Sequence, residues 1–427
     1  MKKAIISFIN RIKSMGKIKG ILYATILFFV GLTTFSIFSF SGRPFFNEIN
    51  NLIHAVLILL IFIYILIYGS FRFDIFFILL ALFNITVLIS SVLSGFVNFR
   101  ITTVILSVVA FFLYQFLICE NNRQDTVRAI LAGSLGFILY FIAVYFVPIF
   151  TLDFSTRLGF YFDDVNYVGR YFLFIYIFFL FYVLFQKNYR LIPIAVIALF
   201  LMVTTGSMSN LFSSVLITII LFLFFIPKEK RYILVISIFS LMIIGFLLLQ
   251  LDALDYYRER IYGILGSVLN ISTLNSDGST EYRSILLTEA FYMFLKKPLF
   301  GYGFYSVASY SLTGQFSHNN IMDLLANHGI FATLLFEYLI LAPIAKMSQK
   351  VEKNRALYIA LGIYIFIYQM FLVTYYHKFE YFVFALLYAY VYEEKDKHFS
   401  FSMKIHPEVK LENTFLIKEK LNHAKNP

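Results

Sequence analysis

The sequence contains few charged residues, no tryptophan and a single cysteine. Charged residues make up 14% of its 427 positions, and Cys119 is the only thiol. One cysteine excludes an intramolecular disulfide. Hydrophobic residues make up 60% of the chain and aromatic residues 20%. This composition excludes an ordinary soluble domain, in which apolar residues are close to half of the chain.

The apolar residues are gathered into runs near or above the roughly 18 residues that indicate a membrane-spanning helix. The runs do not alternate between apolar and polar positions, so they predict helices rather than the strands of a barrel. We therefore expect an all-α polytopic membrane protein with about 12 transmembrane helices. The predicted spans are 20–40, 52–68, 75–96, 101–119, 127–150, 165–185, 191–205, 210–226, 232–251, 330–345, 356–375 and 379–392.

The positive residues behind the net charge of +11 are distributed as the predicted topology requires. Most of the 35 lysines and arginines lie in residues 1–19, in the tail 393–427 and in the short connections predicted on the same side. Positive charge marks the cytoplasmic side of a membrane protein, so both termini are predicted to be cytoplasmic. A nucleic-acid partner is not needed to explain the charge.

A cleaved signal peptide is disfavoured because the first apolar run is too long. Residues 20–392 form one predicted membrane domain.

One long loop, residues 252–329, is predicted on the outer face between the ninth and tenth spans, and loops of this length are usually functional. Ser279 or Thr280 can begin a helix that ends at Pro298. Helical spacing places Arg283 on one face with Leu287, Ala290 and Phe294. A cation on an apolar face indicates either an anion-binding site or an arginine that reaches the membrane interface.

Four short motifs follow one another between residues 157 and 319. They are Arg157-Leu-Gly159 with Asn166, Thr205-Gly206-Ser207, Arg283 to Pro298-Leu-Phe-Gly301-Tyr-Gly303, and His318-Asn319. In this order and in these loops, they resemble the O-antigen polymerase and ligase family of bacterial envelopes. Three positions depart from the family pattern: Val165 stands where proline is usual, Met208 where arginine is frequent, and Asn327 where an acidic residue is common.

The resemblance implies glycosyl transfer on the outer face of the bacterial inner membrane, without a metal or other cofactor. The implied donor is an oligosaccharide repeat on undecaprenyl pyrophosphate. The acceptor is another lipid-linked repeat for a polymerase, which we favour, or a lipid A core for a ligase. A chain-length regulator and a flippase are candidate partners. A lipid-linked sugar transporter is a weaker alternative, because twelve-helix carriers usually have their long linker inside, between two halves.

The residue types suit this chemistry. Departure of a pyrophosphate develops negative charge, which arginine can bind through two parallel hydrogen bonds. Arg157 and Arg283 are the candidates, with Arg258 and Arg260 as additions. The acceptor hydroxyl must lose a proton, and His318 is positioned at a loop-to-helix junction to take it. A histidine at the membrane interface with no catalytic role is the alternative for His318.

Further polar residues are candidates for substrate binding. Arg170 lies one turn inside a predicted span, where a charge is costly, so we expect it to pair with Asp163 or with a phosphate. The motif asparagines Asn166 and Asn319 are also placed in the substrate site. Asp163 and Asp164 could bind a divalent cation, although adjacent carboxylates usually form a solvated turn. A last group, His377, Lys378 and Glu380, is expected to anchor the final span at the interface.

Overall fold

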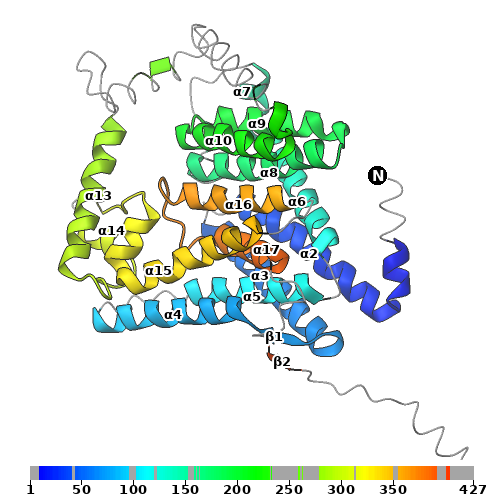
Figure 1. Cartoon of the computed structure of the whole chain (residues 1–427), viewed down its shortest axis with the longest axis horizontal. Coiled ribbons are helices and arrows are strands. Elements are labelled where there is room, and N and C mark those ends of the chain that lie inside the picture. Colours follow the sequence, from blue (N-terminus) through cyan, green and yellow to red (C-terminus); the bar gives the residue numbers. More distant parts are fainter. Residues whose placement is uncertain are drawn as a thin grey trace, which may run out of the picture.

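The computed structural model describes residues 9–40, 44–95, 102–119, 123–151, 158–159, 161–162, 164–230, 232, 258–259, 262, 278–311, 314–349, 354–391 and 401–403. These residues are almost entirely helical (Figure 1). Before the long loop the helices are α2 (Lys17–Phe40), α3 (Pro44–Tyr68), α4 (Ile75–Leu93), α5 (Thr102–Ile118), α6 (Arg123–Val144), α7 (Phe146–Phe150), α8 (Val165–Phe185), α9 (Ile192–Thr204) and α10 (Met208–Phe225). From residue 278 onwards they are α13 (Gly278–Lys296), α14 (Ser306–Tyr310), α15 (Asn320–Ser348), α16 (Arg355–Tyr368) and α17 (Lys378–Val391).

Seven helices of the described residues are long and apolar enough to cross a membrane. They are α2, α3, α4, α6, α8, α10 and α15, while α5, α9 and α16 are apolar but shorter. The predicted class of all-α membrane protein is confirmed. The ninth predicted span, residues 232–251, falls almost wholly outside the described residues, so the count of about 12 stays a prediction.

Three predicted boundaries were wrong. The span predicted at 127–150 is interrupted at Tyr145, where α6 ends and the short α7 begins. The span predicted at 356–375 ends as a helix at Tyr368, and a loop follows. The span predicted at 330–345 is the second part of a longer helix, α15. Hydropathy alone could not locate the first two boundaries, because the apolar residues continue through both of them.

Most helices run side by side in Figure 1, whereas α13 crosses their direction at one end of the bundle, next to α14. Helix α17 is buried along its length, since every residue from Phe379 to Val391 is inaccessible. It packs on α5, α15 and α16. Helix α8 is also largely buried and contacts α9, α10 and α16. These two central helices carry the polar side chains described below.

Segments predicted on the cytoplasmic side meet at the end of the bundle away from α13. Arg11, before α2, forms an ion pair of 3.1 Å with Asp125 at the start of α6. Residues of the tail form β2 (Phe401–Met403), which pairs antiparallel with β1 (Phe71–Phe73) in the connection between α3 and α4. This pair of short strands was not predicted. Both contacts join segments that the predicted topology places on one side of the membrane.

Candidate functional site

Helix α15 is broken at Gly329, where φ is 75° and ψ is −174°. A break of this kind leaves backbone groups without their helical partners. Here the turn formed by residues 298–303 supplies new ones. Tyr302 N donates to Ala326 O at 2.9 Å, and Ile330 N donates to Pro298 O at 2.9 Å. The turn after α13 thus binds both sides of the break at Gly329.

Glycine is required on both sides of this contact, because the backbone of the 298–303 turn approaches the backbone of α15 closely. A Cβ atom on Gly329 would lie 2.1 Å from Leu299 O, and one on Gly301 would lie 2.5 Å from the backbone of Asn327. Both distances are far below van der Waals contact. The Pro-Leu-x-Gly-x-Gly motif therefore has a structural purpose: it joins the end of α13 to the break in α15.

Helix α13 is also held by side chains. Leu286 and Ala290 are fully buried, and Ala290 packs with Val307 of α14 and Ala326 of α15. Arg283 lies one turn before Leu286 and is half-buried. The predicted partner Leu287 is 36% exposed, so the buried face of α13 is rotated from the predicted one. Arg283 nevertheless stays beside the packed side of the helix.

His318 lies directly before α15 in the left-handed backbone conformation, with a φ of 54°. Asn319 is the N-cap of α15, and its side chain accepts a hydrogen bond from Met322 N at 3.0 Å. On the other side of His318, Ser317 donates its backbone N–H to Asp323 Oδ1 at 2.8 Å, and its hydroxyl donates to the same oxygen. The histidine is thus the central residue of a closed turn on the first turn of α15.

Two charges from distant segments act on His318. Burial lowers the pKa of its imidazole, the positive charge of Arg283 lowers it further, and the negative charge of Asp164 raises it. Such charge effects fall off steeply with distance. Arg283 on α13 and Asp164 at the start of α8 thus both act electrostatically on His318, although the sequence separates them by more than a hundred positions.

The start of α8 is bound to the Thr205-Gly206-Ser207 turn. Asp164 caps α8 by accepting a hydrogen bond from Asn166 N at 2.7 Å. Ser207 Oγ donates to Asn166 Oδ1 at 2.8 Å, and Asn210 Nδ2 donates to Asn166 O at 3.0 Å. Asn166 of the first motif and the Thr205-Gly206-Ser207 motif are therefore joined directly at the start of α8.

Residues 193–336 match the family model described as O-antigen ligase. This match supports the O-antigen polymerase and ligase superfamily, which the sequence motifs resemble. The matched segment runs from α9 into the second part of α15 and contains Arg283 and His318. Enzymes of this superfamily are ligases and polymerases of the glycosyltransferase type. No curated protein matches the chain.

Arg170 of α8 is fully buried and pairs with Glu380 of α17. Its second nitrogen, Nη2, donates to Glu380 Oε2 at 3.3 Å. The rings of Tyr167 and Phe379 lie 5.1 and 4.8 Å from the guanidinium carbon. The prediction that Glu380 anchors the last span at the interface was wrong, because the buried arginine requires this carboxylate as its counter-ion.

His377 is part of the same group. Its ring stacks on Tyr167 at 4.3 Å between centroids, and its Nδ1 lies 3.5 Å from Arg170 Nη2. Burial and then the charges of Arg170 and Lys378 lower the pKa of His377 well below its ordinary value. The imidazole is therefore neutral and can accept a hydrogen bond from the guanidinium. His377 is therefore a partner of Arg170 whose side chain is only 16% exposed.

The loop between α16 and α17 connects this buried pair with the His318 turn. Asn320, at the start of α15, accepts hydrogen bonds on Oδ1 from Thr374 N at 2.7 Å and Tyr375 N at 2.8 Å. Its Nδ2 donates to Gln369 Oε1 at 2.7 Å. The loop that begins at Gln369 and carries His377 is thus fixed both to α15 and to α8.

The structure places some predicted site residues and not others. Arg157, Arg260 and Asp163 lie outside the described residues. Arg258 is described and half-buried. Within the described part of the chain, no three His, Cys, Asp or Glu side chains are grouped as they would be in a metal site. Sequence reasoning missed Ser317, Asp323 and Gln369; for the first two, their spacing of six residues around a helix start was the available signal.

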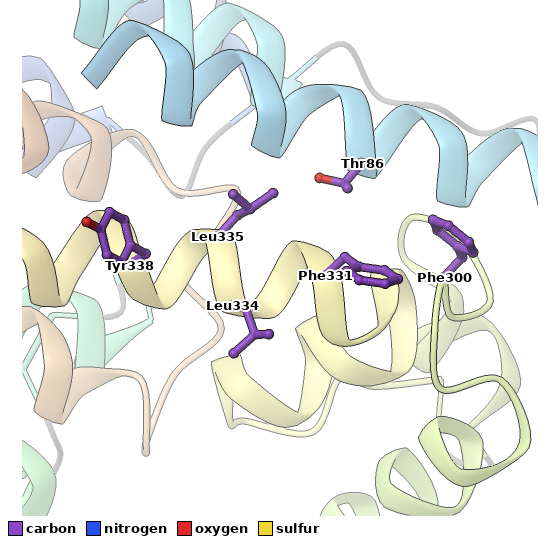
Figure 2. A pocket seen from close by; sticks show the side chains of 6 residues that line it. All are labelled: Thr86, Phe300, Phe331, Leu334, Leu335 and Tyr338. Atoms are coloured by element: carbon purple, nitrogen blue, oxygen red, sulfur yellow. The ribbon is translucent and has the colours of Figure 1, made fainter. Parts of the chain in front are cut away.

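An apolar groove of about 540 Å³ lies between α4 and the second part of α15. Figure 2 shows Phe331, Leu334 and Tyr338 along α15, with Thr86 on α4 opposite them. Phe300 of the 298–303 turn closes one end, and its ring centroid lies 5.7 Å from that of Phe331. The Thr86 hydroxyl is satisfied within α4, where it donates to Leu82 O at 2.7 Å. The groove therefore offers hydrocarbon contact and little polar binding.

Proposed function

We propose that the protein polymerises oligosaccharide repeats carried on undecaprenyl pyrophosphate, on the outer face of the bacterial inner membrane. The observation that supports this most is the joint action of Arg283 and Asp164 on His318. It links a cation on α13, a candidate base before α15 and the start of α8 through their electrostatic interaction. A transferase that releases a pyrophosphate needs such a pairing of base and cation.

In the proposed reaction His318 removes the proton from a hydroxyl of the acceptor sugar. The hydroxyl oxygen then forms a bond to the anomeric carbon of the donor. The bond from this carbon to the pyrophosphate oxygen breaks, and its electron pair leaves on the pyrophosphate, which remains attached to the lipid. The proton stays on His318 until it is released to solvent. Charge is conserved, because the positive charge gained by His318 balances the negative charge gained by the leaving pyrophosphate.

His318 must be neutral to act as a base. Burial and Arg283 both lower its pKa from the ordinary value of 6.5, and Asp164 opposes them. The imidazole is accordingly neutral near pH 7. The positive charge of Arg283 disfavours the imidazolium form of His318 in the free enzyme. The neutral base is therefore available when the substrates bind.

Arg283 is proposed to bind the departing pyrophosphate together with Arg157. A planar guanidinium can hold two phosphate oxygens at once and supplies the positive charge that the leaving group requires. Arg258 and Arg260 are proposed as additional contacts to the phosphates. Asn166 and Asn319 are proposed to position sugar hydroxyls. Arg170 is proposed to act on the substrate only indirectly, because Glu380 occupies its guanidinium.

The second candidate is an O-antigen ligase, which transfers the finished glycan to lipid A core. The description of the matching family model favours it. Both reactions share the donor, the leaving group and the base, and they differ in the acceptor alone. The family match disfavours a transporter. A chain-length regulator and a flippase remain predicted partners of the polymerase.

Deletion of the gene in its host distinguishes the two reactions. Loss of a polymerase leaves a single repeat on the acceptor and removes the ladder of longer glycans from a gel. Loss of a ligase leaves an undecorated acceptor, while long lipid-linked chains accumulate. An unchanged surface glycan in the deletion strain would contradict both.

A further inference from the structure

The backbone at His318 is in a conformation that side-chain-bearing residues rarely adopt. Its φ of 54° lies in the left-handed region, where Cβ crowds the neighbouring carbonyl oxygen. Residues held in such conformations persist only where the surrounding structure determines them, and they are concentrated at functional sites. Some contact in this turn must therefore hold His318 in place.

Asp323 supplies that contact. Its carboxylate is 2% exposed, and Oδ1 accepts both the backbone N–H of Ser317 at 2.8 Å and the Ser317 hydroxyl. The hydroxyl oxygen of Ser317 in turn accepts the backbone N–H of Asn319 at 3.2 Å. One buried carboxylate on α15 thus fixes the residues on both sides of His318.

The imidazole ring is not fixed in the usual way. Catalytic histidines are commonly oriented by a carboxylate that accepts a hydrogen bond from the second ring nitrogen. Nδ1 of His318 is buried and has no hydrogen-bond partner among the described residues. The ring instead packs against Phe316, with 4.9 Å between centroids. The orientation of the ring therefore depends on the backbone that carries it.

We propose that Asp323 is a positioning residue that orients the His318 imidazole through Ser317 and the backbone, rather than through the ring. This inference rests on the proposed role of His318 as the base. Its alternative is that Asp323 only stabilises α15, because a negative charge in the first turn of a helix is favourable. The two differ in what they require of residue 323. Positioning requires a hydrogen-bond acceptor, whereas the helix effect requires a charge.

Substitution of Asp323 by asparagine and by alanine separates these requirements. Asp323→Asn keeps an oxygen that can accept both bonds from Ser317 but removes the charge. Positioning predicts that kcat of the purified enzyme on lipid-linked repeats stays within about twofold of wild type, whereas Asp323→Ala lowers kcat about tenfold or more with little change in KM. Equal losses in both variants would overturn the proposal, and so would a wild-type kcat in Asp323→Ala.

The double variant with His318→Ala shows whether Asp323 acts through the histidine. We expect Asp323→Ala to reduce the residual kcat of His318→Ala by no more than about twofold, since there is no imidazole left to position. A full tenfold further loss would assign Asp323 to the general fold and contradict the proposal. If Asp323→Ala does not fold, Ser317→Ala tests the same chain of contacts: we expect a several-fold loss of kcat, and an unchanged kcat would overturn the inference.

The result also separates this inference from the proposed function. Near-normal turnover in His318→Ala would remove the base itself, whatever Asp323 does. An inactive His318→Ala enzyme with a fully active Asp323→Ala enzyme would leave the base in place and disprove the positioning role alone.

Discussion

Arg170 on α8 and Glu380 on α17 form an ion pair in which each side chain is only 1% exposed. The pair joins the helix that begins at Asp164 to the most buried helix of the bundle, and His377 and Tyr167 complete its surroundings. A buried ion pair adds little net stability compared with apolar residues of the same size. Removal of one partner, however, leaves the other charge buried and uncompensated.

We therefore expect Arg170→Ala to lower the free energy of unfolding by about 3–5 kcal/mol, the range measured for broken buried pairs. Arg128→Ala is the matched control. Arg128 pairs with Asp125 at 2.8 Å, but its side chain is 48% exposed, and Arg11 remains to bind the carboxylate. The control should lose no more than about 1 kcal/mol. Denaturant titration in mild detergent measures both, and equal effects would contradict the role given to the buried pair.

The contact between Gly329 and the 298–303 turn can be tested with two glycines. Gly329 and Gly314 have similar φ values of 75° and 71°, but a Cβ on Gly314 would meet nothing within 4 Å. Gly314→Ala should therefore show only the backbone cost of about 1 kcal/mol, whereas Gly329→Ala should also separate the turn from α15 and cost clearly more. Thermal unfolding of the two variants gives the difference. Equal melting temperatures would show that the 298–303 turn shifts to accommodate the added Cβ atom, and would contradict the expected loss of this contact.

Much of the fold was readable from the sequence, because the membrane imposes a simple rule. Apolar runs such as 165–185 were predicted with the observed bounds of α8. The rule fails where apolar sequence continues through a change of structure, as it does after Tyr368 and at Tyr145. It also cannot show which helix lies at the centre. The burial of α17 depends on its neighbours, so Glu380 was wrongly placed at the interface.

The sequence predicted the site as a set of motifs, but not the contacts between residues that are distant in the sequence. The His318-Asn319 motif lies in the turn before α15, and Asn319 is the N-cap of that helix. The partner of Arg170 could not be predicted, because Glu380 is more than two hundred positions away and no local pattern connects them. Asp323 was missed for another reason: its effect on His318 passes through the backbone of Ser317, and contacts of this kind leave no sequence motif.

The pH dependence of the reaction should reveal the two charges near His318. Because the base must be neutral, kcat/KM rises as pH increases through the pKa of His318, which lies below 6.5. Arg283→Gln removes a charge that lowers this pKa, so the acid limb of the profile of kcat/KM against pH should move to higher pH. Asp164→Asn removes the charge that raises it and keeps a side chain able to cap α8, so the limb should move to lower pH.

Arg283→Lys is the control for these shifts. It keeps the positive charge, so the acid limb should stay close to its wild-type position. The maximum kcat/KM should nevertheless fall by about tenfold or more, because an ammonium group cannot replace the two parallel hydrogen bonds of a guanidinium. Shifts of the same sign in Arg283→Gln and Asp164→Asn would show that these charges do not act on the base.

The predicted topology can be tested by labelling cysteines in a background that carries Cys119→Ser. Ser284 on α13 and Ser348 at the end of α15 are both exposed. The first lies in the predicted outer loop, and the second borders a connection predicted in the cytoplasm. In intact cells a membrane-impermeant thiol reagent should label Ser284→Cys, and it should label Ser348→Cys only after permeabilisation. The opposite pattern would place α13 and His318 in the cytoplasm and contradict the proposed reaction.

The most direct test is turnover of purified His318→Ala enzyme on a lipid-linked repeat. Loss of a positioned general base should reduce kcat by about 10²-fold or more while binding of the donor is nearly unchanged. His328→Ala is the control, because His328 is fully buried beside Ser90, with Nδ1 at 3.2 Å from its hydroxyl oxygen, and is assigned no chemical role. That variant should lose stability but keep most of its kcat per folded molecule. Near-normal turnover in His318→Ala would contradict the assignment of His318 as the base.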